Sequence, residues 1–480
     1  MQGIHLYIGL TNLADVIENK EREQQIPLIS AFVGAFFDGT NDFIKKLSFA
    51  NEQRLHVEKF TGDRIHIVFG NTGTLSSDFY SVVNGVSLLV GKLNQAQEMQ
   101  KLPTISINMG ADFGDYENAP IDFQSEDKSK SIKEKNTIGF PANKAAKIQD
   151  KTNPGEIHFS NRVKDLLDLG AVHEISDSTG WYSAFTTRYS DTKIYALTIA
   201  EFLRGNSRPH QVFDSVQNNR SLLLESVNTL EQKLNALTSD FLTEGKRIKT
   251  YDSVELTAKA TKYKGFVIYA DIRHSTTLLS HWPQGSGQYH AICNDLQKRI
   301  YAMLGGITKN GCDHIQVQGD RETAMLPEKA DADEKATGEL ILKTAFSLLK
   351  GNINIPLLEG LGQPGETLPI GIGISFGEFH GRTIGPGDAK ENFLCGRIIN
   401  DTDDAEDKGA KADNTIALTV PAYEEICRVA GDPVKKTVRD LFKREGVYYV
   451  SHGTYDDYRN KMAQYSRQTA FEGPKPWLDD

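Results

Sequence analysis

The chain has 480 residues, of which 39% are hydrophobic and 25% are charged, and its formal net charge is −10. This length exceeds one ordinary hydrophobic core, so two or three domains are expected. The acidic balance argues against a broad nucleic-acid or anionic-membrane surface, and no apolar run approaches the roughly 18 residues of a membrane span.

The N-terminus and the cysteines indicate the compartment. The first ten residues lack the basic flank and small-residue cleavage site of a signal peptide, and they predict a strand instead. The four cysteines show no metal-type spacing. Together these features predict reduced thiols in a cytoplasmic protein.

Strands and helices are predicted to alternate through the first 200 residues. After the strand at 1–10, the hydrophobic patterns predict a helix over 27–47, two strands within 54–69, a helix over 76–93 and a strand over 103–113. A polar, charge-rich loop is predicted over 115–136, followed by a helix over about 138–149.

A long helix is predicted between the two halves of the chain. Its apolar residues step by four and three positions, which is a heptad seam: Leu223, Val227, Leu230, Leu234, Leu237 and Phe241. A coiled coil and a helix packed on a neighbouring domain explain this seam equally well. The seam divides the chain into domains over 1–205 and 259–480, joined by a helical linker over 206–258.

The second half opens on a stretch that ends in a carboxylate. Residues 266–270 predict a buried strand, Asp271 follows at its end, and Ser275 or Thr276 is the expected N-cap of a helix. A carboxylate beside the N–H groups of a helix start suits a divalent metal and a polyphosphate. The plain alternative is an Asp that merely ends a strand.

The second half repeats the first in outline. The segment from His56 to Asp63 matches the segment from His314 to Asp320, and Asn143 matches Asn400. The offset of the two Asp residues (320 − 63) and that of the two Asn residues (400 − 143) are both 257. Two matches at one offset predict two copies of one α+β domain, a sheet covered by helices. We call residues 1–205 copy one and residues 259–480 copy two.

Each copy has lost the part of a site that the other retains. Copy two has Asp271 and Asp320, whereas copy one has Gly9 at the position of Asp271. Copy one has Asn143 and Lys147 on one helical face, where they suit a ribose oxygen and a charged α-phosphate. Copy two instead has five acidic residues within 400–407, which would repel a triphosphate.

On these motifs the chain resembles the class III nucleotidyl cyclases, the adenylate/guanylate cyclase family, over about 1–200 and 260–455. The resemblance implies two head-to-tail cyclase domains that form a pseudo-heterodimer with the active site between them. It also implies conversion of a nucleoside triphosphate to a 3′,5′-cyclic nucleotide and pyrophosphate with two Mg²⁺ or Mn²⁺ ions. Whether the domains pair within a monomer or between the chains of a homodimer is left open.

The resemblance also assigns roles to the matching residues. Asn143 orients the ribose, and Lys147 stands where the family has Arg, as a point charge without the bidentate fork. A further cation is expected on a late hairpin, at Arg188 or Lys193. The remaining assignments are metal binding by Asp271, Asp320 and the Ile272 carbonyl, and phosphate binding by the turn of Ile272, Arg273, His274, Ser275 and Thr276.

The base is assigned to Lys59 and Asn136, which stand where adenylate cyclases have Lys and Asp. A donor plus an amide fits the edges of adenine, cytosine, uracil and guanine alike, so these two residues leave the base open. A chain of two divergent cyclase domains without a recognisable sensor resembles the pyrimidine cyclases of Pycsar anti-phage systems. That resemblance favours UTP or CTP, giving cUMP or cCMP for a cyclic-nucleotide effector. The alternatives are an adenylate cyclase and an inactive nucleotide-binding homologue.

Overall fold

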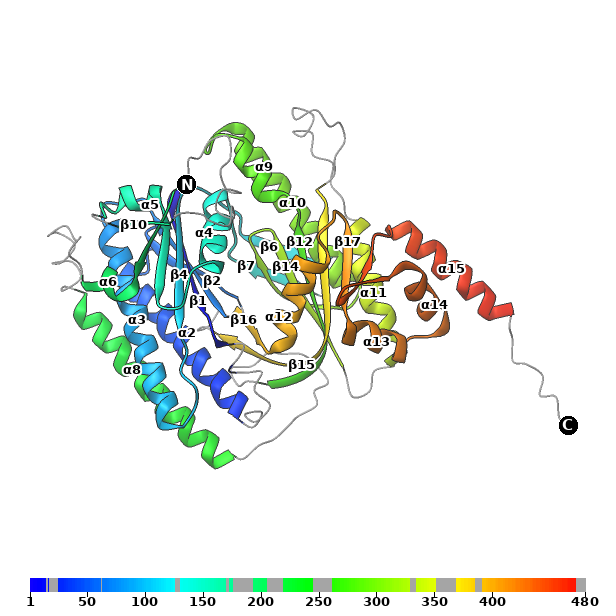
Figure 1. Cartoon of the computed structure of the whole chain (residues 1–480), viewed down its shortest axis with the longest axis horizontal. Coiled ribbons are helices and arrows are strands. Elements are labelled where there is room, and N and C mark those ends of the chain that lie inside the picture. The colour runs from blue at the N-terminus through cyan, green and yellow to red at the C-terminus, as the bar shows by residue number, and fades with distance from the viewer. Residues whose placement is uncertain are drawn as a thin grey trace.

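The computed structural model contains two mixed β-sheets flanked by helices (Figure 1). The predicted domain limits near residues 205 and 258 lie outside the residues that it describes. The described residues are 1–13, 16, 25–61, 63–125, 130–169, 172–175, 193–204, 219–244, 261–328, 334–350, 368–384 and 391–471.

The sheet of copy one has the strand order β10-β11-β9-β4-β1-β3-β2. Its central strand β1 pairs antiparallel with β3 and β4, and β4 pairs parallel with β9. The strand bounds are β1 (Gln2–Leu10), β2 (Leu55–Thr61), β3 (Arg64–Gly70), β4 (Ile107–Asp115), β9 (Glu156–Ser160), β10 (His173–Glu174) and β11 (Ile194–Thr198).

The sheet of copy two has the strand order β13-β14-β12-β15-β17-β19-β18, with β16 added on β15. It matches the order of copy one read from the other end, β2-β3-β1-β4-β9-β11-β10. The parallel pair recurs as β15 with β17. The bounds are β12 (Thr261–Ile272), β13 (Asp313–Gln318), β14 (Arg321–Pro327), β15 (Ile370–Ile384), β16 (Glu391–Cys395), β17 (Thr415–Thr419), β18 (Lys443–Glu445) and β19 (Tyr448–Ser451). The prediction of two α+β domains of one kind is confirmed.

A bulge in equivalent strands corrects one detail of the sequence alignment. The register of β2 shifts between Val57 and Lys59, and that of β13 shifts between His314 and Gln316. Both shifts are 257 residues apart, as are the Gly-Asp turns that follow. His314 is therefore the counterpart of Val57 rather than of His56.

Three long helices cover the outer face of the first sheet: α2 (Ile26–Ser48), α3 (Leu75–Met99) and α8 (Arg220–Glu244) (Figure 1). Leu230 and Leu234 of α8 are buried in the same core as Ile4 and Leu6 of β1. Each buried leucine contributes about 1.5–3 kcal/mol of transfer free energy. Of the two explanations of the heptad seam, the helix packed on a neighbouring domain describes the molecule.

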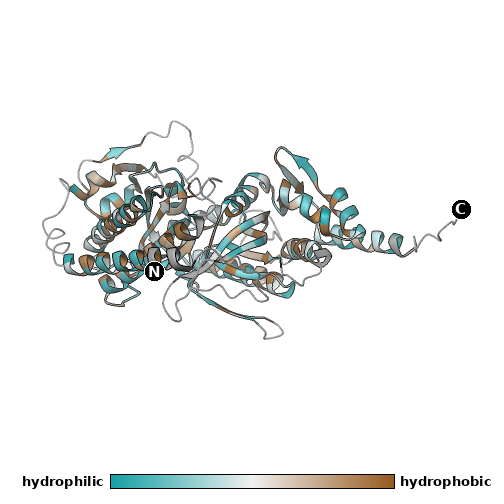
Figure 2. Ribbon diagram, turned by 90° about the horizontal axis from the view of Figure 1, so that it is seen from below, coloured by the Kyte–Doolittle hydropathy of each residue, from teal (hydrophilic) through white to brown (hydrophobic). Residues whose placement is uncertain are grey.

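Shorter helices complete the two copies. In Figure 2 the helices carry alternating hydrophobic and hydrophilic stripes, as expected for helices that bury one side. In Figure 1, α15 extends from the second sheet toward the C-terminus. The bounds are α4 (Phe140–Asp150), α5 (Asn161–Leu166), α6 (Ile199–Arg204), α9 (Ser275–His281), α10 (Gly287–Lys309), α11 (Glu334–Lys350), α12 (Arg397–Asp404), the π-helix η4 (Ala405–Gly409), α13 (Val420–Val429), α14 (Asp432–Leu441) and α15 (Tyr455–Phe471).

The predicted loop over 115–136 is wrong, because this segment forms an arm of short strands that docks on copy two. The strands are β5 (Glu117–Asn118), β6 (Ile121–Gln124), β7 (Ser131–Glu134) and β8 (Thr137–Ile138). Ile121, Ile132 and Ile138 are buried in the core of copy two. The sequence pattern indicated a loop because charged residues separate these isoleucines. The apolar surface on which they pack belongs to the other copy.

Among the helices that the structure describes, none combines the length and the apolar character required to cross a bilayer.

Candidate active site between the two copies

Asp271 and Asp320 meet at one end of the second sheet. Asp271 is the last but one residue of β12, and Asp320 lies in the turn from β13 to β14, where its carbonyl accepts a hydrogen bond from the Ile272 N–H (3.3 Å). Burial and the charge of Asp271 raise the pKa of Asp320 to about 7, and a hydrogen bond with Ser275 opposes this rise. Two acids that repel each other in a buried place favour a bound cation.

The donor set fits a hard divalent ion. Carboxylate and carbonyl oxygens are the ligands that Mg²⁺ takes from proteins, and it usually keeps water or substrate oxygens in its other positions. No group of three or more His, Cys, Asp or Glu side chains that would hold a metal occurs in the described part of the chain. An ion at Asp271 and Asp320 would take its remaining ligands from carbonyl oxygens, water or a bound substrate.

The turn after Asp271 differs from the prediction in its cap. The N-cap of α9 is His274, in the left-handed region with φ 63°, and not Ser275 or Thr276. The His274 ring contacts Asp413 (Nε2 to Oδ1, 2.8 Å), which ties this uncommon backbone to the turn before β17. The Arg273 N–H donates to the Pro369 carbonyl (2.8 Å). The N–H groups of Ile272 and Arg273 are thus engaged, whereas Ser275 and Thr276 lie in the first turn of α9.

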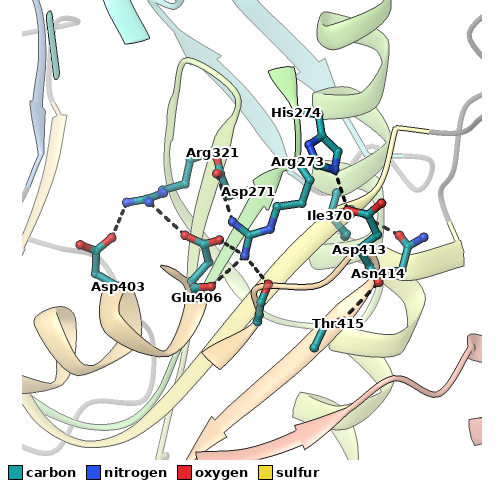
Figure 3. A network of polar contacts seen from close by, with 11 residues as sticks. Asp271, Arg273, His274, Arg321, Ile370, Asp403, Glu406, Asp413, Asn414 and Thr415 are labelled. Atoms are coloured by element: carbon teal, nitrogen blue, oxygen red, sulfur yellow. Dashed lines mark hydrogen bonds and ion pairs between the residues drawn. The ribbon is translucent and has the colours of Figure 1, made fainter. Parts of the chain in front are cut away.

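A buried ion cluster lies behind Asp271 (Figure 3). Glu406 of η4 is bracketed by two guanidinium groups, from Arg273 (Nη2 to Oε1, 2.6 Å) and Arg321 (Nη2 to Oε2, 3.0 Å). Arg273 Nη1 also lies 4.0 Å from Asp271 Oδ2, and Arg321 pairs with Asp403 (2.5 Å). Burial and the charge of Asp271 raise the pKa of Glu406 to about 8. The sequence analysis missed Glu406, although the acidic run at 400–407 contains it.

Copy one presents Asn143 to this turn. Asn143 Nδ2 donates to Thr276 Oγ1 across the interface (3.1 Å). Lys147 lies one turn further along α4, and its side chain is exposed. The structure therefore brings Asn143 together with the turn after Asp271.

Lys59 is buried in a chain of charges that crosses the interface. Its Nζ donates to Glu134 Oε2 (2.6 Å), and Glu134 Oε1 contacts His314 Nε2 (2.6 Å). His314 Nδ1 then contacts Glu322 (2.5 Å). Although burial opposes ionisation of both groups, the neighbouring acids raise the pKa of His314 to about 10, and Lys59 and His314 lower the pKa of Glu134. Sequence reasoning missed Glu134 and His314, because only the docked arm makes them neighbours.

Asn136 also contacts copy two, through both ends of its amide. Its Nδ2 donates to the Gly319 carbonyl (3.0 Å), and its Oδ1 accepts from the Gly319 N–H (2.9 Å). Of the two late cations, Arg188 lies outside the described residues. Lys193 contacts Glu174 on the edge strand β10 (3.1 Å).

The fold of the chain is similar to that of a protein of known structure. A crystal structure of a class III adenylyl cyclase-like ATP-binding protein from Pseudomonas aeruginosa matches 96% of this chain and 90% of its own, with 16% identity and a TM-score of 0.60. The chain has the tandem class III cyclase fold.

Single cyclase domains match one part of the chain. The guanylyl cyclase Cya2 covers 41% of this chain and 91% of its own, with 15% identity and a TM-score of 0.32. The adenylyl cyclase CyaB from P. aeruginosa covers 40% and 96%, with 15% identity and a TM-score of 0.31. No family model and no curated protein matches the sequence.

In copy one, side chains fill the space at Gly9, the position that corresponds to Asp271. A Cβ at Gly9 would lie 2.1 Å from Gln149 Nε2 and 2.6 Å from Asn108 Oδ1, and these two amides hydrogen-bond each other (2.7 Å). Arg64 pairs with Asp150 (2.7 Å) beside Asp63. Burial, together with Asp403 and Asp150, raises the pKa of Asp63. In copy one Arg64 therefore lies between Asp63 and Asp150, and Gly9 stands where copy two has Asp271.

Proposed function

We propose that the protein is a nucleotidyl cyclase that converts a nucleoside triphosphate to its 3′,5′-cyclic nucleotide and pyrophosphate. One observation carries this proposal: Asp271 and Asp320 of copy two lie together, and Asn143 of copy one reaches the same turn. The cyclase fold supplies the context, because its two domains meet at this place.

The reaction forms a bond from O3′ to the α-phosphorus and breaks the bond from the α-phosphorus to the bridging oxygen. The electron pair of the broken bond leaves with pyrophosphate, and the proton of the 3′-hydroxyl passes to solvent water. Asp271, Asp320 and the Ile272 carbonyl would hold two Mg²⁺ or Mn²⁺ ions, which when bound activate the 3′-hydroxyl and neutralise the leaving group. Asn143 orients the ribose, and Lys147 offsets the charge that grows on the α-phosphoryl oxygens. Within the phosphate-binding turn predicted over Arg273 to Thr276, His274, Ser275 and Thr276 would receive the phosphates, because the Arg273 N–H and guanidinium are engaged within copy two.

The lead substrate in this proposal is a pyrimidine nucleotide, UTP or CTP. Lys59 and Asn136 are 2% and 1% exposed and are bonded to protein groups. A one-ring base needs less space beside these two packed side chains than a purine does. The products would be cUMP or cCMP, which in antiviral signalling would act on a separate effector protein. ATP is the alternative substrate.

A second candidate is a protein that binds a nucleotide without turning it over. The Lys at position 147 weakens phosphate recognition relative to Arg, because an ammonium lacks the bidentate fork. The similar P. aeruginosa structure is itself described as a cyclase-like ATP-binding protein.

Mass spectrometry after incubation with each of the four triphosphates and Mn²⁺ separates these candidates. A cyclase yields a cyclic product, and D271A yields none. Binding of a triphosphate by the wild type without any cyclic product would reject turnover and favour the second candidate. A product from ATP alone would reject the pyrimidine assignment.

A further inference from the structure

The turn that carries Asp320 is held from the other copy. Gly319, the residue before Asp320, has φ +60°, which favours glycine. Its N–H and its C=O are both bonded by the Asn136 amide of copy one, at 2.9 and 3.0 Å. Within copy two, the Ile272 N–H bonds the Asp320 carbonyl at 3.3 Å. A single side chain of copy one thus satisfies both polar groups of Gly319.

Other residues of copy one surround the same turn. Glu134, two residues before Asn136, accepts from the Val317 N–H (2.9 Å). The side chains of Glu134 and Asn136, two alternate residues of the arm, thus accept from the N–H groups of Val317 and Gly319, two alternate residues of β13 and its turn. The Tyr7 hydroxyl hydrogen-bonds the Gln318 side chain. The site of a Cβ on Gly319 would lie 3.6 Å from Asn143 Oδ1.

Asn136 has little capacity left for a nucleobase. Its side chain is 1% exposed, and both its carbonyl oxygen and its amino group are already engaged. Recognition of a base would break at least one of these bonds and leave a buried backbone group of Gly319 unpaired, which is costly.

We propose that Asn136 is a positioning residue that fixes the Gly319–Asp320 turn, so that metal binding by copy two depends on the docked arm of copy one. This inference rests on the proposed function for its catalytic consequence, but the positioning itself is a property of the free protein. Asn136 then acts through Asp320 and does not select the base.

The test compares N136A with a matched control, N392A. Asn392 also donates from its side chain to a backbone carbonyl of β13, that of Ile315 (3.4 Å), but it lies away from the turn. Three quantities are measured on the full chain: hydrogen exchange of the Gly319 amide, the Kd of Mn²⁺ by calorimetry, and the cyclisation rates of ATP, CTP, UTP and GTP.

In N136A we expect exchange at Gly319 to rise at least tenfold, the Mn²⁺ Kd to rise about tenfold, and the four rates to fall by one common factor. N392A changes each quantity by less than about twofold. Unchanged exchange and Kd, with an altered ratio between the bases, would overturn the proposal in favour of base reading. If the wild type makes no cyclic product, exchange and Mn²⁺ binding still decide the positioning role, and only the proposed function fails.

N136D provides a second, nearly isosteric variant in case N136A does not fold. An Asp keeps the acceptor for the Gly319 N–H and loses the donor to the Gly319 carbonyl. Because the Gly319 carbonyl loses its donor, we expect exchange of the Gly319 amide to rise, though less than in N136A, and the ratio between the bases to stay unchanged. A shift of that ratio toward adenine and cytosine, which carry an amine, contradicts the proposal.

Discussion

Equivalent positions in the two copies hold opposite arrangements of one side chain and one glycine. In copy one Gly9 pairs with Asn108, and in copy two Asp271 pairs with Gly371. The space above each pair accepts one side chain, because a Cβ at Gly9 or at Gly371 would collide with its neighbours. The copies therefore differ at both positions of the pair: the strand that carries the side chain in one copy carries the glycine in the other.

The helical residue that lies over each pair also differs between the copies. Gln149 and Glu406 lie 257 residues apart (406 − 149). Gln149 bonds the Asn108 amide, whereas Glu406 pairs with Arg273 and Arg321. A neutral amide pair fills this position in copy one, whereas in copy two Asp271 lies among two guanidinium groups and three further acids, Asp320, Asp403 and Glu406. Packing thus fills this position in copy one, whereas copy two keeps a carboxylate there among charged groups.

The two copies also differ in the polarity of equivalent side chains on one face of the sheet, in β1 and in β12. In copy one His5 and His66 hydrogen-bond each other (2.9 Å), and His66 stacks on Tyr7. In copy two Val267 and Tyr269 belong to an apolar cluster with Phe379. Burial lowers the pKa of His5 to about 3, so this face of copy one is polar but uncharged there.

The largest expected effect comes from replacing the equivalent acids of the two copies, one at a time. D320N removes a proposed metal ligand and should lower the cyclisation rate by about 10³-fold or more, equivalent to roughly 4 kcal/mol of barrier. D63N, its counterpart in copy one, should stay within about threefold of the wild type. Steady-state rates with Mn²⁺ check both. Equal losses in the two variants would show that the copies are not specialised as described.

The next test exchanges equivalent asparagines on the helices. N143A removes the contact with Thr276 and should lower kcat by about 10²-fold, since misplaced substrate groups cost rates of this size. N400A, whose side chain is exposed on α12, should change kcat by less than about twofold. A larger effect of N400A would place the working cleft on the other side.

A third test attempts to restore the lost acid of copy one. G9D should destabilise the fold by about 1–3 kcal/mol, because its Cβ would overlap the Gln149 amide. G91A is the control, since a Cβ at Gly91 in α3 meets nothing within 4 Å and should stabilise the helix by about 0.5–1 kcal/mol. Chemical denaturation measures both. A stable G9D protein would mean that the cleft of copy one is open.

The smallest effect concerns pH and the metal-free protein. The raised pKa of Asp320, about 7, means that its contribution to stability is complete below the ordinary carboxyl pKa and is lost as pH rises through 7. Metal-free D320N should therefore unfold at a higher Tm than the wild type at pH 8, by roughly 2–4 °C, and at the same Tm near pH 4. Thermal melts with and without Mn²⁺ test this. If the metal-free wild type unfolds at a higher Tm than metal-free D320N at pH 8, this result contradicts the repulsion between Asp271 and Asp320.

Local patterns were sufficient for most of the elements and for the duplication. The predicted helices over 27–47 and 76–93 correspond to α2 and α3, and the repeated Gly-Asp turn lies between equivalent strands in both copies. These features depend on hydrophobic period and on turn residues, which act over short distances. The arm over 115–136 could not be predicted in this way, since its buried side chains pack on the other copy.

The sequence by itself determined that the chain holds two unequal copies of one α+β domain, because strand, helix and turn patterns are local and recur at a constant offset. Only the tertiary structure decided which residues meet. It joined Asp271 to Asp320, closed the cleft at Gly9 with Gln149, and placed Asn136 on Gly319 and Glu134 between Lys59 and His314. Side-chain contacts across an interface depend on the docking of surfaces that lie far apart in the chain, and no local pattern encodes that docking.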